Sequence, residues 1–129
     1  MVIRQQNNTT TKHLKTNKMN KKFIPYEQAL ALQRLGFDEE CFGTWFELEG
    51  KYSIIIRNNL YRNDLQTPSP LYQQAFRWFR EKHGLNYVII KAESWFYTIN
   101  GCNTQEGFKT YEEAELDCLK KLIEIVKSK

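Results

Sequence analysis

One stretch decides the fold: Ser69-Pro70-Leu71-Tyr72-Gln73-Gln74-Ala75-Phe76-Arg77-Trp78-Phe79-Arg80-Glu81-Lys82-His83-Gly84. Its ends carry helix signals, because Ser69 is placed to cap a first turn, Pro70 suits the first helical position and Gly84 suits a left-handed turn after the last one. Five apolar residues recur at three- and four-residue steps and share one face: Leu71, Tyr72, Ala75, Phe76 and Phe79. We therefore predict a central core helix, with a strand pair on each side of it in the sequence.

The same helix carries the candidate contact residues. Trp78 widens the apolar face, and basic side chains flank it. Basic residues interleaved with aromatic rings can hold single-stranded nucleic acid, with stacking worth ~1–3 kcal/mol per base. The competing interpretation places the rings, including Tyr87 and Trp95 further on, in the core and the charges in water. The candidates for contact with nucleic acid or a partner protein are Arg77, Trp78, Arg80 and Lys82.

Length and charge indicate one domain behind a basic tail. The chain has 129 residues, of which 41% are hydrophobic and 26% charged, a globular composition. Residues 1–22 hold six basic residues and no acid, so we predict a disordered basic tail over 1–22 and a single domain over 23–129. No apolar run is long enough to span a membrane, and no secretory signal is visible. With three scattered cysteines, this favours a cytoplasmic protein with reduced thiols and no membrane partner.

The order of hydrophobic patterns predicts an α+β fold. Glu49-Gly50 lies between two β-rich runs, which is typical of a tight hairpin. Gly36 suits the left-handed position after the first helix, and Thr110 and Glu113 form a capping box at the start of the last helix. The expected elements are helices over 26–35, 70–83 and 111–126, strands over 44–48, 52–57, 87–91 and 95–99, and loops over 58–68 and 100–107. This α-ββ-α-ββ-α order predicts two layers, with about four mainly antiparallel strands in two hairpins and three helices.

Signals for catalysis, metals and cofactors are weak. Structural zinc needs about four Cys or His ligands, usually in close pairs, and the pairs are absent. Cys41 or Cys102 with His83 would make a nucleophile and base, but no flanking signature supports it. Glu49-Gly50-Lys51 after Asp38 has the outline of a metal-dependent nuclease motif, although a hairpin turn explains the pair better. We predict no catalytic residue, no metal ligand and no cofactor.

Three separated segments resemble a group of small proteins of Bacteroidetes genomes, often in phage-like or mobile regions. The segments are Phe23-Ile24-Pro25-Tyr26-Glu27-Gln28-Ala29-Leu30-Ala31-Leu32, Pro70-Leu71-Tyr72-Gln73-Gln74-Ala75-Phe76-Arg77-Trp78-Phe79-Arg80-Glu81-Lys82 and Phe108-Lys109-Thr110-Tyr111-Glu112-Glu113-Ala114-Glu115. The resemblance covers most of residues 23–127 and implies a bacterial or phage setting, but no activity. We expect a non-enzymatic binding or accessory module of a phage or mobile element. The alternatives are a nucleic-acid-binding protein and a small metal-dependent hydrolase or nuclease.

Overall fold

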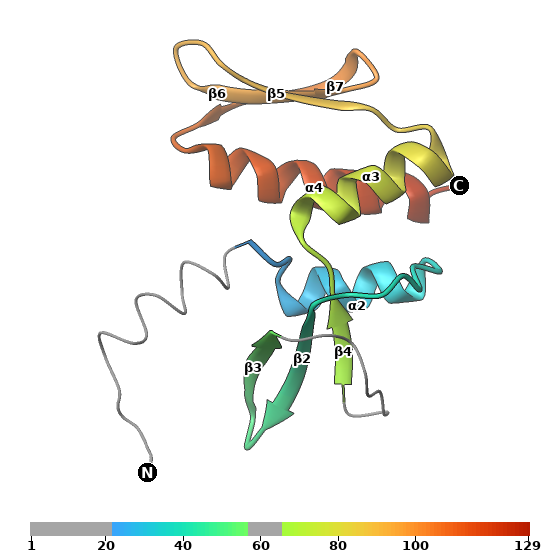
Figure 1. Ribbon diagram of the computed structural model, residues 1–129. Helices are drawn as coiled ribbons and strands as arrows, with labels where there is room; N and C mark the ends of the chain where they lie inside the picture. Colours follow the sequence, from blue (N-terminus) through green and yellow to red (C-terminus); the bar gives the residue numbers. More distant parts are fainter. Residues whose placement is uncertain (1–21, 57–65) are drawn as a thin grey trace.

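The computed structural model describes residues 22–56 and 66–129, where three helices and six strands form two antiparallel sheets (Figure 1). The α+β class is confirmed, with six strands where we predicted four. Except for Lys22, the predicted basic tail lies outside the described residues. The elements are α2 (Tyr26–Arg34), β2 (Gly43–Leu48), β3 (Lys51–Ile56), β4 (Gln66–Ser69), α3 (Tyr72–His83), β5 (Tyr87–Lys91), β6 (Trp95–Ile99), β7 (Cys102–Phe108) and α4 (Tyr111–Lys127).

The three helices lie between the two sheets (Figure 1). One sheet has the strand order β5-β6-β7 and covers α3 and α4, while the other has the order β3-β2-β4 and extends away from α2. One core cluster joins buried residues of all three helices and of β6, including Leu32, Phe76, Phe79, Tyr97 and Leu119. The arrangement differs from the predicted two layers because each half of the chain builds its own sheet.

Helix α3 begins two residues later than predicted. Ser69 is the last residue of β4, and its hydroxyl donates across the fold to the backbone oxygen of Ile24 at 2.9 Å instead of capping α3. The indole nitrogen of Trp45 donates to the same oxygen, also at 2.9 Å. The residue before the helix is Leu71, which makes no side-chain cap. The predicted end is confirmed, since Gly84 has the left-handed φ of 65°.

Strand β4 occupies the end of the predicted 58–68 loop. It pairs with β2 in the register Gly43↔Ser69 to Phe46↔Gln66. Pro68 lies within it, which is tolerated because β4 is an edge strand and needs no backbone donor on its outer side. The rest of that loop, up to residue 65, lies outside the described residues.

Strand β7 occupies the region predicted as the polar 100–107 loop. It pairs antiparallel with β6, and every residue in it before Phe108 is exposed. The Asn100-Gly101 turn before it has φ values of 54° and 73°, the left-handed pair that a two-residue hairpin needs. The predicted turn at Glu49-Gly50 is confirmed with φ values of 53° and 79°.

The predicted helix signals at α2 and α4 are confirmed. The Thr110 hydroxyl accepts from the backbone N–H of Glu113 at 3.1 Å, and the Glu113 carboxylate accepts from the backbone N–H of Lys109 at 3.1 Å. At the end of α2, Gly36 has a φ of 104°, and the backbone N–H of Phe37 donates back to Leu32 at 3.0 Å. That bond buries Phe37 against the core and ends the helix.

Candidate binding surface

The four predicted contact residues on α3 do not share one surface. Arg77, Arg80 and Lys82 are exposed, whereas Trp78 is 4% exposed. The Trp78 ring packs edge-on against Phe37 and His83, with ring centroids 5.5 and 4.9 Å apart. A buried indole has no open face on which a base could stack. The guanidinium of Arg77 is 3.7 Å from the Glu39 carboxylate, so part of its charge is used within the fold.

Tyr87 and Trp95 do not form an open aromatic surface either. Tyr87 is half-buried and stacks on Phe76 with ring centroids 4.1 Å apart. Trp95 is half-buried and meets Tyr111 edge-on at 5.5 Å. Both rings lie on the inner side of their sheet. The stacking platform considered for single-stranded nucleic acid is therefore not formed by these rings.

The residues considered for catalysis come from different elements: Cys41 is buried before β2, Cys102 is exposed at the start of β7 and His83 ends α3. The described residues contain no group of three or more His, Cys, Asp or Glu side chains arranged to hold a metal ion. His83 packs against aromatic rings, and burial lowers the pKa of its imidazole. Burial raises the pKa of the Cys118 thiol to about 12, which disfavours the nucleophilic thiolate. Glu49-Gly50-Lys51 forms the β2–β3 turn and the first residue of β3.

The sheet β5-β6-β7 has one covered face and one open face. The covered face carries Tyr97 and Ile99, which are 1% and 0% exposed and belong to the core with residues of α4. On the opposite face, Val88 and Ile90 of β5 are each 45% exposed. They pair with Thr98 and Phe96 of β6, so the four side chains lie together. We call Val88, Ile90, Phe96 and Thr98 the outer patch.

Strand β5 is also an edge of that sheet, and only β6 pairs with it among the strands that the structure describes. The flanking pairs Asn86–Asn100 and Ala92–Ser94 are joined by backbone bonds of 2.7 and 2.9 Å. Hydrogen-bonded and non-hydrogen-bonded pairs alternate along an antiparallel ladder. The odd-numbered residues between these two bonded pairs therefore point their backbone N–H and C=O groups away from β6. These residues are Tyr87, Ile89 and Lys91. They give the sheet an edge that a further strand can extend.

A half-buried carboxylate lies among tyrosines below the sheet. Burial raises the pKa of Glu115 to about 6, against the opposing effect of a hydrogen bond from Tyr111, and the charge of Glu112 adds to the rise. The charge of Glu115 in turn adds to the effect of burial in raising the pKa values of Tyr72, Tyr87 and Tyr111. No ion pair to Glu115 is formed within the described residues. The carboxylate is thus a pH-sensitive element of the fold.

Replacing Glu115 by glutamine is expected to stabilise the protein at pH 7 by about 1 kcal/mol, a value reduced from the full pKa shift because water reaches the carboxyl. A carboxyl whose pKa rises on folding from 4.5 to about 6 loses stability as pH rises through that window. The gain should therefore vanish near pH 4.5. Urea unfolding at several pH values measures it, with the exposed Glu81→Gln as control. A gain that is equal at pH 4.5 and 7 would contradict the assignment.

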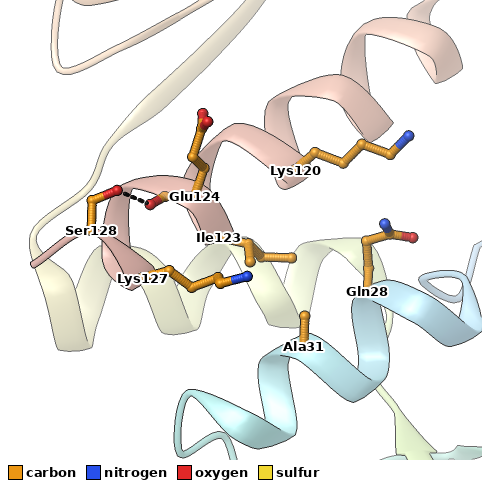
Figure 2. A pocket seen from close by; sticks show the side chains of 7 residues that line it. All are labelled: Gln28, Ala31, Lys120, Ile123, Glu124, Lys127 and Ser128. Atoms are coloured by element: carbon orange, nitrogen blue, oxygen red, sulfur yellow. Dashed lines mark hydrogen bonds between the residues drawn. The ribbon is translucent and has the colours of Figure 1, made fainter.

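A groove lies between α2 and α4 (Figure 2). Its volume is about 430 Å³. Ala31 and Ile123 lie on its apolar floor, with Lys120 and Lys127 on the α4 side and Gln28 on α2. The hydroxyl of Ser128 donates to the backbone of Glu124 at 2.9 Å, which closes the last turn of α4. The groove is open to solvent, and its lysines are surface side chains.

Comparisons with known proteins indicate neither a family nor a function for this chain. No protein-family model, no curated protein and no solved structure matches the chain. Within the described residues, no helix is both long and apolar enough to cross a membrane.

Proposed function

We propose that this protein is a non-catalytic module that binds an extended segment of another protein along strand β5. The observation that carries the proposal is the 45% exposure of both Val88 and Ile90 on the open face of the sheet. Exposed apolar side chains that gather on one face mark interaction sites more often than isolated ones do. The open backbone groups of β5 add a second means of attachment to the same place.

Fewer features of the described residues support the two alternatives. Nucleic-acid binding needs accessible rings beside the basic residues, and Trp78 is 4% exposed. A metal-dependent hydrolase needs a ligand cluster, and the described residues hold none. We propose a bacterium that carries a phage-like or mobile element as the setting, from the resemblance of the three sequence segments, and its cytoplasm as the location, from the scattered cysteines as well.

Site-specific photo-crosslinking tests the proposal. A photoreactive residue at position 88, in cells that express the protein naturally, is expected to yield a discrete protein adduct. The same residue at position 81, exposed on α3, serves as the control and should not yield it. In a second variant carrying the probe at position 88, Ile90→Thr keeps a β-branched strand residue and removes apolar area, so the adduct should weaken severalfold.

The outcome against the proposal is equally specific. Equal crosslinking from positions 88 and 81, or an adduct at 88 that Ile90→Thr leaves unchanged, would show that the outer patch does not select a partner. Because both residues are exposed, the substitutions should change stability by less than about 0.5 kcal/mol. Thermal unfolding of each variant checks this.

A further inference from the structure

We propose that the segment bound along β5 alternates apolar and acidic residues, and that Arg80 on α3 selects the acidic ones. This inference rests on the proposed function and adds to it the chemistry of the partner. It uses the β5 edge, the outer patch and the flank of α3 that faces the sheet. Each of the three restricts a different part of the bound segment.

The backbone of β5 restricts the conformation of the segment. The N–H and C=O groups of Tyr87, Ile89 and Lys91 point to the open side of the strand, as the flanking 2.7 and 2.9 Å bonds require. A segment that satisfies them must be extended, with side chains alternating between the two faces of the sheet. Opposite edge β7 is less suited, because its pairing with β6 contains register shifts.

The outer patch restricts the side chains on one face. Side chains of an added strand that point outward lie beside Val88 and Ile90, each 45% exposed. Neighbouring side chains on one face of a sheet interact directly, and β-branched residues favour apolar neighbours. Alternate residues of the segment are therefore apolar.

The flank of α3 restricts the side chains on the other face. Gln73, Phe76 and Arg80 follow three- and four-residue steps and so share one side of the helix. The 4.1 Å stack of Phe76 on Tyr87 places that side next to β5. Burial and the charge of Glu115 raise the pKa of Tyr87, and the positive charge of Arg80 opposes that rise. Arg80 is exposed and has no ion pair within the described residues.

An acidic side chain of the bound segment on that face would be attracted by the positive charge of Arg80, which has no ion pair within the described residues. The charge of Glu115 also acts on the pKa of Tyr87, but the Glu115 carboxyl is half-buried, and burial raises its own pKa. Guanidinium groups bind carboxylates through two parallel hydrogen bonds, which gives this contact direction as well as charge.

A second copy of the chain is disfavoured as the occupant by the same charges. Two β5 strands paired antiparallel over their full length would place Lys91 of one copy opposite Tyr87 of the other. The lysine would then lie on the inner face, close to Arg80, where like charges repel. Lysine on an edge strand is a common device against self-association.

Two synthetic peptides of equal length test the inference, one alternating valine and glutamate and the other alternating valine and lysine. We expect the full-length protein to bind the glutamate peptide in fluorescence anisotropy and to bind the lysine peptide at least tenfold more weakly. Arg80→Glu should reverse that preference. Arg34→Glu, an exposed charge at the end of α2, is the matched control and should leave the preference unchanged.

The outcomes separate the inference from the proposed function. Equal binding of both peptides that Val88→Thr/Ile90→Thr abolishes would overturn the acidic preference and leave the β5 surface in place. Binding of neither peptide, with no crosslink from position 88, would overturn both. Capture of a single-stranded oligonucleotide that Arg80→Glu abolishes, without peptide binding, would overturn the inference in favour of nucleic acid. A dimer formed through β5 would also overturn the inference, because a second copy would then occupy the edge.

Discussion

Replacing Phe79 by alanine is expected to lower the free energy of unfolding by about 3–5 kcal/mol. Phe79 is 0% exposed and meets the Trp78 ring edge-on at 5.1 Å. Removing the ring would lose its burial and leave a cavity that α3 and its neighbours cannot refill without moving. Phe76→Ala should act similarly, because Phe76 is 1% exposed and supports Tyr87.

Urea denaturation of both variants provides the measurement. Phe42→Ala is a matched control, since Phe42 is the same residue type but 58% exposed, and it should change stability by less than about 0.5 kcal/mol. Unchanged stability in both Phe76→Ala and Phe79→Ala would show that these rings of α3 do not contribute to the core. Losses of this size in a domain of marginal stability should also appear as a large drop in the melting temperature.

Local signals predicted the helices well because helix caps are short-range chemistry. Gly36, Gly84 and the Thr110–Glu113 box each act within one turn, and all three are found where predicted. The start of α3 was different. Ser69 bonds to Ile24, which is distant in sequence, and that tertiary contact overrides its capping preference. A pattern limited to neighbours cannot anticipate such a partner.

The two missed strands have different causes. Strand β7 is polar at nearly every position, so neither alternation nor apolar content indicates it. Its available signal is Asn100-Gly101, a strong hairpin dipeptide that the prediction placed in a loop. Strand β4 contains Pro68, which argues against a central strand and is compatible only with an edge position.

The candidate site was predicted only in part. The exposed charges of α3 follow in part from helical spacing, which correctly places Arg77 and Lys82 on the solvent side. The sequence left two interpretations of Trp78 open, an exposed contact residue or a core residue, and Phe37, from another part of the chain, covers the ring. The exposure of Val88 and Ile90 was hidden, because β5 is apolar at four consecutive positions and reads as a strand covered on both faces.

Gly43→Ala is expected to lower the free energy of unfolding by about 1–3 kcal/mol, the usual cost of overpacking a filled site. A Cβ on Gly43 would lie 2.7 Å and 2.8 Å from two carbons of the Phe23 ring and 3.0 Å from the Ile54 side chain. Phe23 cannot easily move away, because it is 3% exposed and forms a backbone bridge to Leu71.

A double-mutant cycle with Phe23→Leu identifies the cause of that loss. The smaller, flexible side chain should make room for the new methyl group, so Gly43→Ala should cost less in the Phe23→Leu background than in the wild type. The difference measures the clash separately from any change in strand preference at position 43. Additive losses would mean that the close approach of Phe23 to the β2 backbone is not what requires glycine there. A non-additive result would show that the Phe23 ring, packed against the β2 backbone, is what excludes a side chain at position 43.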